Sequence, residues 1–498
     1  MSQRAALWGA GVLLGTLVAV LFLALPRFSG EAKLEQKPPA PTYRLVWLPC
    51  RDTGDVLPDV DCARLLTSGD TFELDVAVLR YTESDKQASP LVYLQGGPGL
   101  RLEMDKAALV SWGHFRDYAG LKRDLILINR RGTGPRAPWQ CPAYESLGRE
   151  LLEADLTLAQ EWAHGRKALD DCLAELAGFN PQALGTQHSV QDIKALVSLL
   201  GLDAWHLLGV SYGTRLGLAL ADAPGLQSIV LDSVYPPAEG GVAVWPQTLA
   251  GALEQFAAAC ASESSCAEQW HSRFPDLALD KDSFLSQLYD LLDELARMPM
   301  RVDVRVEGLP KRVLVNDHRF LAAVFAASYH HRRWSALVAA LADGRARERK
   351  AVAALMDTFV QQALSDSVNT LTFLAVDCRD NPVGQEAAYN RQVARYPELA
   401  AYTQTLWRDQ ICHQWPAAEP PVLPDLSHSR ARVMLLSGEF DPITPPQWSA
   451  SLQRVYPQIH RSEFPATGHH ILGARPCALA QLEDFISARR ERIASCAE

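Results

Sequence analysis

The pentapeptide Gly209–Gly213 (GVSYG) constrains this chain more than any other feature, because it places the pattern G-x-S-x-G in a specific context. The apolar run Trp205–Val210 predicts a buried strand that leads to the serine, and Tyr212–Ala221 predicts a helix after it. Small residues at such a turn permit a strained backbone that presents a serine hydroxyl at the end of the strand. We therefore predict that Ser211 is a nucleophile; an ordinary strand-to-helix turn is the alternative.

The sequence around this motif alternates predicted strands with predicted helices. Thr71–Tyr81 alternates apolar and polar residues, as a half-buried strand does. Ser189–Leu200 has helical spacing, and Ser189 with Asp192 three residues later resembles a helix-capping pair. Short apolar runs predict further buried strands at Leu91–Leu94, Leu125–Asn129, Ser228–Asp232 and Val433–Ser437. The alternation predicts an α/β fold in which helices flank a mostly parallel sheet.

This alternation is interrupted between about residues 240 and 420. The interrupting stretch is rich in Ala, Leu, Gln and Arg and predicts several helices, with strand-like segments at Met300–Val306 and Arg312–Asn316 around Gly308. Strand signals resume at residue 431. We therefore predict a helical cap (240–420) inserted into a core made of residues 43–239 and 421–498.

Composition and motifs exclude several classes of protein. The 498 residues are 48% hydrophobic and 21% charged, which is typical of a globular chain. The net charge is −10, so we do not expect nucleic acid as a partner. No G-x-G-x-x-G follows the first predicted strand turn, and the Cys and His residues lack the spacing of zinc ligands. We therefore expect neither a cofactor nor a metal.

The N-terminus predicts export. Arg4 precedes an apolar run, Ala5–Leu25, which has the length of a secretory signal or of a membrane anchor. Residues 1–29 are therefore predicted to be a signal peptide or anchor, and residues 30–42 a linker. In either case the bulk of the chain is expected to be periplasmic or extracellular, tethered to the membrane if the segment is retained.

The ten cysteines fit an exported protein, because disulfides persist in oxidising compartments. Their number is even, and they follow one another in pairs along the chain. Sequential pairing is one of the connectivities that the sequence allows. It gives Cys50–Cys62, Cys141–Cys172, Cys260–Cys266, Cys378–Cys412 and Cys477–Cys496.

A serine nucleophile needs a base and an acid that orients the base. The order along the chain in α/β-hydrolases is Ser, acid, His. Asp441 follows the predicted strand Val433–Ser437, and His469 follows another strand-like run. We assign these two residues as acid and base, with Glu439 and His470 as the competing choices.

The oxyanion of an acyl-transfer reaction needs backbone N–H donors. The segment Gln95–Gly99 (QGGPG) follows the predicted strand Leu91–Leu94, and its glycines allow the backbone to approach a substrate closely. We assign the N–H groups of Gly97 and Tyr212 as the donors. An ordinary β-turn at Gln95–Gly99 is the alternative.

Several segments together resemble the prolyl/tripeptidyl-aminopeptidase family of α/β-hydrolases, in its exported branch with a TAP-like C-terminal segment. They are QGGPG (95–99), NRRGTGPR (129–136), GVSYGTRLG (209–217), SGEFDPITP (437–445) and GHH (468–470). The resemblance covers about residues 45–498 and implies the α/β-hydrolase fold and the same triad and oxyanion donors. Two departures are Gln95, where many members carry His, and Asn129–Arg131, where an acid often precedes the RG-G pattern.

The resemblance also implies a serine exopeptidase whose substrate is a peptide with a free N-terminus. Members of the family bind the α-amino group through acidic residues of the cap, and the segment Val376–Asp380 nominates Asp380, with Asp377 as the alternative. Two other functions stay open: an esterase or lipase-like hydrolase of the same fold, and a membrane-tethered binding protein on a hydrolase scaffold.

Overall fold

The computed structural model describes residues 42–488, apart from 51–56, 68–71, 238, 241–243, 307, 330, 364–366, 382–385, 401–411, 413–414 and 416–424. The predicted signal or anchor, Ala5–Leu25, lies outside the described residues, as does most of the predicted linker. Within the described part of the chain, none of the helices has both the length and the apolar character needed to cross a bilayer.

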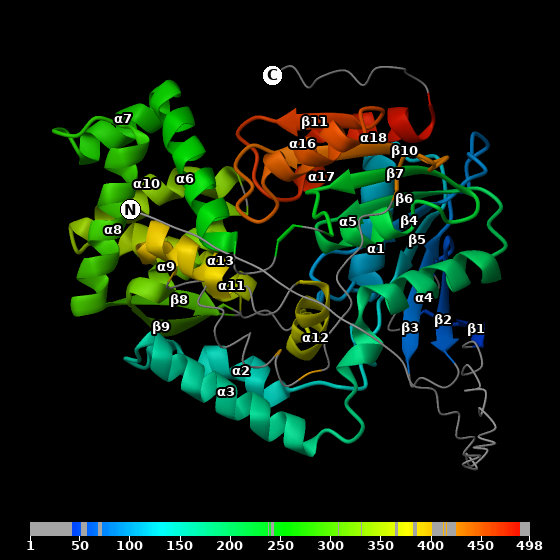
Figure 1. Ribbon diagram of the computed structural model, residues 1–498, viewed down its shortest axis with the longest axis horizontal. Coiled ribbons are helices and arrows are strands. Elements are labelled where there is room, and N and C mark those ends of the chain that lie inside the picture. Colours follow the sequence, from blue (N-terminus) through cyan, green and yellow to red (C-terminus); the bar gives the residue numbers. More distant parts are fainter. Residues whose placement is uncertain are drawn as a thin grey trace, which may run out of the picture. The chain divides into compact units, whose positions relative to one another are not determined.

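A nine-stranded sheet forms the centre of the fold, in the order β1-β2-β3-β5-β4-β6-β7-β10-β11 (Figure 1). β1 pairs antiparallel with β2, β2 pairs antiparallel with β3, and β3 pairs antiparallel with β5. All strands from β5 to β11 in this order run parallel. The strands are β1 Tyr43–Leu48, β2 Val60–Thr67, β3 Glu73–Leu79, β4 Leu91–Leu94, β5 Leu125–Ile128, β6 Trp205–Val210, β7 Leu226–Asp232, β10 Arg432–Gly438 and β11 His460–Phe464. The predicted α/β fold is confirmed.

Alternating side chains of the strands form two apolar layers, one on each face of the sheet. In β5, Ile126 and Ile128 belong to one layer, and Leu125 and Leu127 belong to the other. One layer is covered by α4 (Thr186–Leu199), α5 (Tyr212–Ala219) and α16 (Pro446–Val455), and the other by α1 (Lys106–Tyr118), α17 (Ile471–Ala474) and α18 (Pro476–Ile486). Parallel strands buried on both faces are continuous apolar runs in sequence, which is why they could be predicted.

The chain between β7 and β10 is mainly helical and occupies the stretch for which we predict the cap (Figure 1). Much of it has an apolar core of its own, in which Phe256, Trp270 and Trp334 are buried. Its hairpin β8–β9 turns at Gly308, as expected, although β9 begins before Arg312. The elements are α6 Trp245–Ser262, α7 Ser264–Arg273, α8 Lys281–Arg297, β8 Met300–Val306, β9 Leu309–Val315, α9 Asp317–Ser328, α10 His331–Arg345, α11 Lys350–Ala363, α12 Thr370–Asp380, α13 Glu386–Arg395 and α14 Pro397–Ala400.

A second segment also packs against this helical cluster, although the sequence analysis assigned it to the core. It contains α2 (Pro142–Glu150), the short helix η1 (Leu151–Glu153) and α3 (Leu158–Glu175). Arg319 of α9 is buried and donates hydrogen bonds to the carbonyl of Leu152 (2.9 Å) and to the carboxylate of Glu161 (2.9 Å). These polar contacts join residues more than 150 positions apart, so no local pattern could have predicted them.

The predicted capping pair Ser189–Asp192 is wrong. Helix α4 begins at Thr186, and both residues are buried inside it. The Asp192 carboxylate instead accepts two hydrogen bonds from Arg131 (2.7 and 2.8 Å) and one from the Tyr43 hydroxyl (3.0 Å). The Asp192 carboxylate therefore pairs with a buried arginine from the loop after β5 and does not cap a helix.

The structure contains the first four sequential disulfides, in which Cα atoms are 5.0 to 5.8 Å apart. Cys477 is also disulfide-bonded, whereas the partner expected for it, Cys496, lies outside the described residues. No free cysteine occurs in the described part of the chain. The Cys141–Cys172 bond links the start of α2 to α3, and the Cys378–Cys412 bond holds the end of α12.

Candidate active site

Ser211 occupies a strained turn between β6 and α5. Its backbone angles are φ 54° and ψ −121°, a conformation that non-glycine residues rarely adopt. A Cβ atom on Gly209 would lie 2.5 Å from the Gly213 carbonyl oxygen, and one on Gly213 would lie 2.1 Å from the carbonyl oxygen of Leu94. Both glycines of the motif are therefore required by the close approach of backbone on either side of the serine.

Asp441 and His469, the predicted acid and base, are in contact. His469 Nδ1 lies 2.9 Å from Asp441 Oδ2, and both side chains are buried. The Asp441 carboxylate also accepts the backbone N–H groups of Ile443 and Thr444 (both 2.9 Å) and the Thr444 hydroxyl (2.6 Å). These bonds fix the carboxylate in the loop after β10, so that it can orient the imidazole.

The competing acid and base do not form such a pair. Glu439 accepts the backbone N–H of Ala466 (2.9 Å) and so holds the turn before the histidines. The side chain of His470 is 46% exposed, and its backbone adopts φ 67°. The geometry therefore favours Asp441 and His469 over Glu439 and His470.

Two residues at the end of β7, which the sequence analysis missed, hold the loop that carries His469. The carboxylate of Asp232 is fully buried and accepts the backbone N–H groups of Ile471 (2.8 Å) and Leu472 (2.9 Å). The Ser233 hydroxyl accepts the backbone N–H of His470 (2.8 Å). An acid at the last position of the predicted strand Ser228–Asp232 was the available signal, because functional loops of parallel sheets follow the carboxyl ends of the strands.

Ser211 and His469 line one cavity of about 700 Å³. Its wall is mainly apolar and aromatic, and includes Trp112, Trp245, Phe325, Phe359, Phe373 and Trp448. In the described part of the chain, Ser211 Oγ makes no hydrogen bond to His469. Catalytic hydrogen bonds of this kind often tighten only when substrate is bound.

The predicted oxyanion segment lies beside the serine. A Cβ atom on Gly96 would lie 3.0 Å from Ser211 Cβ and 3.6 Å from its Oγ, and Gly97 adopts φ 113°. The Gly97 N–H makes no hydrogen bond to any residue that the structure describes. Tyr212 is the first residue of α5, so its N–H has no acceptor within the helix. Both N–H groups are thus available to an oxyanion.

The two acids proposed for amine recognition have different surroundings. Asp377 is part of the cavity wall and carries the only carboxylate among the described residues that line it. Asp380 does not line the cavity; it accepts a hydrogen bond from Thr186 and lies 3.6 Å from Arg215. Asp380 therefore faces a buried arginine, whereas Asp377 faces the cavity and accepts a hydrogen bond from the Asn381 side chain.

Helix α12, which carries both acids, also supports the loops around the serine. The backbone N–H of Asn369, its N-cap residue, donates to the Gly99 carbonyl (2.9 Å). The Thr372 hydroxyl donates to the Gly132 carbonyl (2.7 Å). The chain around Asn369 and Thr372 therefore contacts both the oxyanion segment and the loop after β5.

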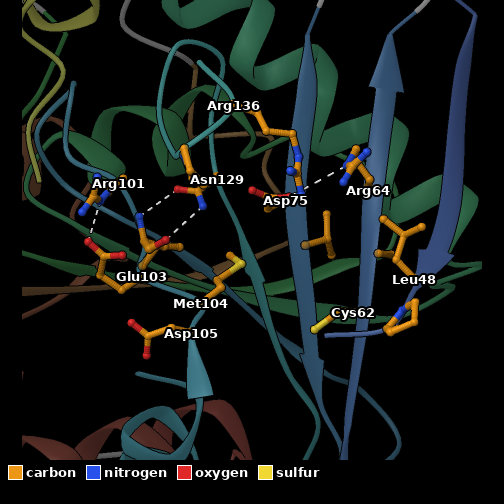
Figure 2. A pocket seen from close by; sticks show the side chains of 15 residues that line it. Leu48, Cys62, Arg64, Asp75, Arg101, Glu103, Met104, Asp105, Asn129 and Arg136 are labelled. Atoms are coloured by element: carbon orange, nitrogen blue, oxygen red, sulfur yellow. Dashed lines mark hydrogen bonds and ion pairs between the residues drawn. The ribbon is translucent and has the colours of Figure 1, made fainter. Parts of the chain in front are cut away.

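A smaller cavity, of about 290 Å³, lies beside the continuation of the oxyanion segment (Figure 2). Some of the charged side chains in its wall pair with one another: Arg136 with Asp75 (3.0 Å) and Arg101 with Glu103 (2.5 Å). The Asn129 side chain is bonded to both the N–H (2.8 Å) and the carbonyl (3.0 Å) of Leu102. This cavity contains no member of the predicted triad, and its polar groups serve to fix the loop.

The pKa of His469 predicts how activity depends on pH. Burial lowers the pKa of the imidazole, but the carboxylates of Asp441 and Asp232 together raise it more, and the resulting pKa lies above the ordinary value of 6.5. A general base must be neutral, so kcat/KM should rise with pH along a limb whose midpoint lies above 6.5. The raised pKa of His469 also contributes to the free energy of unfolding. This contribution is fully present below pH 6.5 and is lost as the pH rises through the raised pKa. A midpoint below 6.5 in a kcat/KM profile would contradict the assignment.

Comparisons with known proteins agree with this geometry. Residues 398–491 match the family described as TAP-like protein. The serine protease Hip1 of Mycobacterium tuberculosis is 22% identical over 480 residues, which cover 88% of this chain and 87% of Hip1. N-formylmaleamate deformylase of Pseudomonas putida is 40% identical over 140 residues, 27% of this chain and 46% of the deformylase.

Among solved structures, the α/β hydrolase MGS-M2 from a deep-sea metagenome library aligns with a TM-score of 0.38 and 11% identity, over 86% of this chain and 99% of that one. The match to the TAP-like family is limited to residues 398–491, at the C-terminal part of the chain. The sheet order, the strained serine turn and the similarity to Hip1 show that the chain has an α/β-hydrolase fold and is a serine hydrolase with a TAP-like C-terminal part.

Proposed function

We propose that this protein is an exported serine aminopeptidase that cleaves peptides from a free N-terminus. The observation that carries the proposal is the position of Asp377, a carboxylate in the wall of the mainly apolar cavity that Ser211 and His469 also line. A cationic α-amine in such a cavity requires an opposite charge, because an unpaired buried charge is strongly destabilising. A serine protease, Hip1, is among the similar proteins.

The proposed reaction is acyl transfer through Ser211. Its Oγ attacks the scissile carbonyl carbon while its proton passes to His469, which Asp441 orients. The tetrahedral intermediate places its negative oxygen against the N–H groups of Gly97 and Tyr212. Collapse breaks the C–N bond, and His469 returns the proton to the leaving amine. Water then attacks the acyl-enzyme by the same route and regenerates the serine.

The lining of the cavity favours substrates with large apolar side chains. Trp245, Phe325 and Phe359 come from the helical segment, and Trp112 and Trp448 come from helices of the core. Aromatic side chains bury large apolar areas against a ligand. We therefore propose short peptides with apolar or aromatic residues near the N-terminus as the substrate class.

Acetylation of the substrate tests the aminopeptidase proposal. Chromogenic peptide amides with a free N-terminus should be hydrolysed, and the same compounds should be poor substrates after N-acetylation, because the amide carries no charge for Asp377 to bind. Equal rates for both forms would refute the aminopeptidase and leave the second candidate, an esterase-like hydrolase. The apolar cavity favours that second candidate, since esters of apolar acids need no carboxylate.

Asp377 and Asp380 form a matched pair of variants for the same question. Asp377→Asn should lower kcat/KM for free-amine substrates about 10- to 100-fold, since a hydrogen bond to a charged group contributes about 1.5–3 kcal/mol. Hydrolysis of a small ester should change little. Asp380→Asn should instead lower the free energy of unfolding, by up to about 3–5 kcal/mol, because Arg215 loses its buried partner.

Steady-state kinetics and thermal unfolding of the two purified variants separate these outcomes. If Asp380→Asn raises KM selectively for free-amine substrates while Asp377→Asn does not, amine recognition belongs to Asp380.

The compartment is part of the proposal. The disulfides at Cys50–Cys62, Cys141–Cys172, Cys260–Cys266 and Cys378–Cys412 support a protein that folds under oxidising conditions. We propose that the N-terminal segment directs the chain to a periplasmic or extracellular location and tethers it to the membrane if it is not removed. Cell fractionation followed by N-terminal sequencing tests both points.

A further inference from the structure

The peptide unit between Gly96 and Gly97 carries the carbonyl of Gly96 and the N–H group of Gly97, and both glycines line the cavity. Gly96 O accepts a hydrogen bond of 2.5 Å from the Nη2 atom of Arg130, which follows β5. Arg130 is 5% exposed and is not part of the cavity wall, whereas both glycines line it. The carbonyl therefore points away from the cavity, toward a buried cation.

Planarity of the peptide then fixes the direction of the N–H group. Peptide bonds are planar and almost always trans, so the C=O and N–H bonds of one unit point in opposite directions. With the Gly96 carbonyl directed toward Arg130, the Gly97 N–H is directed toward the cavity that contains Ser211. This agrees with the absence of a hydrogen-bond acceptor for that N–H among the described residues.

The cation also changes the strength of the donor. A positive charge at the carbonyl oxygen draws electron density through the conjugated peptide, which leaves the N–H more positive; hydrogen bonds in series strengthen one another in this way. The effect is large in a buried site, where little water screens the charge.

Arg130 also contacts the residue that supplies the second donor. Its guanidinium carbon lies 4.7 Å from the centre of the Tyr212 ring, within the range of a cation–π interaction. Its own backbone is fixed by Thr133, whose hydroxyl accepts the Arg130 N–H (3.0 Å) and donates to the Arg130 carbonyl (2.8 Å). One buried side chain therefore contacts the peptide unit that carries the Gly97 N–H and also the ring of Tyr212, whose N–H is the second donor.

We propose that Arg130 is a positioning residue that fixes and polarises the Gly96–Gly97 peptide, so that the Gly97 N–H binds the oxyanion more strongly than an isolated peptide would. This inference rests on the assignment of Gly97 as an oxyanion donor in the proposed function. It does not depend on whether the substrate is a peptide or an ester, since both reactions pass through an oxyanion.

The test compares Arg130→Met and Arg130→Lys with the wild-type protein on a short 4-nitrophenyl ester, which needs no amine recognition. Loss of an oxyanion donor lowers kcat by about 10²–10³, so removing the charge behind the donor should lower kcat about tenfold, with KM unchanged. Arg130→Lys keeps the positive charge but places it differently relative to the Gly96 carbonyl, and it should give an intermediate kcat.

A second readout separates polarisation from general damage. An alkyl trifluoromethyl ketone forms a bond between its carbonyl carbon and Ser211 Oγ; the serine proton passes to His469, and the ketone oxygen becomes an oxyanion. Its inhibition constant should rise across the variants by the same factor as kcat/KM falls. An inhibition constant that stays at the wild-type value would overturn the proposal.

Arg123→Met is the matched control. Arg123 is equally buried and donates to a backbone carbonyl, that of Ser89 (2.8 Å), but it precedes β5, whereas Arg130 follows it. This variant should lose thermal stability while keeping kcat and the inhibition constant. Equal losses of kcat in the Arg123 and Arg130 variants would show that the effect is structural and would refute the inference.

Three further outcomes distinguish the failure of this inference from the failure of the proposed function. If Arg130→Met does not fold, the lysine variant decides, because an unchanged kcat and inhibition constant in that variant overturn the inference. If free-amine peptides are not cleaved but the ester is, the aminopeptidase proposal fails and the Arg130 test still applies. If Ser211→Ala retains ester hydrolysis, the oxyanion assignment and this inference fail together.

Discussion

Replacing Ser211 with alanine should abolish acyl transfer, with kcat lowered by on the order of 10⁴-fold or more, since only binding and oxyanion contributions remain. The hydroxyl is the only nucleophile that the strained turn presents to the cavity. Hydrolysis of a chromogenic amide and covalent labelling by a fluorophosphonate probe measure the loss independently.

The fold of this variant should be unaffected, because in the described part of the chain the Ser211 side chain makes no hydrogen bond that alanine would remove. The melting temperature should therefore match that of the wild-type protein. Ser198→Ala, on the exposed face of α4, serves as the control and should keep full activity. Normal hydrolysis by the Ser211 variant would contradict the proposed mechanism.

Asp441→Asn should be nearly as damaging, with kcat lowered by about 10⁴-fold, as is typical when the orienting acid of a triad becomes an amide. The asparagine can still accept the N–H groups of Ile443 and Thr444, but it cannot hold His469 in the tautomer that leaves Nε2 as a base. The pKa of the imidazole should fall, because burial persists while the carboxylate is gone. The ascending limb of kcat/KM should therefore move to lower pH.

Glu439→Gln is the matched control for this experiment, because Glu439 lies two residues away and its side chain accepts a hydrogen bond from the backbone N–H of Ala466. Its kcat should stay close to the wild-type value. A large loss in Glu439→Gln together with a small one in Asp441→Asn would transfer the role of the orienting acid to Glu439.

The parts of this protein that follow from local sequence could be predicted. The strands β4, β6 and β10 are mainly apolar runs, because burial on both faces leaves few polar positions, such as His206 in β6 and Ser437 in β10. The turn at Ser211 could be predicted because backbone crowding forces glycine on both sides of it. Asp441 and His469 could be paired because residues that follow parallel strands meet at one edge of the sheet.

Long-range pairing of buried charges could not be predicted in this way. Asp380 is paired with Arg215, 165 positions earlier, and no local pattern around Asp380 indicates this partner. In the same way, Asp192 accepts hydrogen bonds from the distant Arg131 and does not cap its own helix. Such partners depend on the packing of elements that are distant in sequence, and the residue types alone do not identify them.

The Cys378–Cys412 bond has a practical consequence for producing the protein. It joins the end of α12 to a residue 34 positions later, and α12 carries Asp377 near the substrate cavity. Loss of a native disulfide typically costs about 2–5 kcal/mol of stability. Recombinant protein made in a reducing cytoplasm should therefore lack this bond, so that α12 is less firmly held even where the serine site is intact. Assays of substrate preference should use secreted or oxidatively refolded protein.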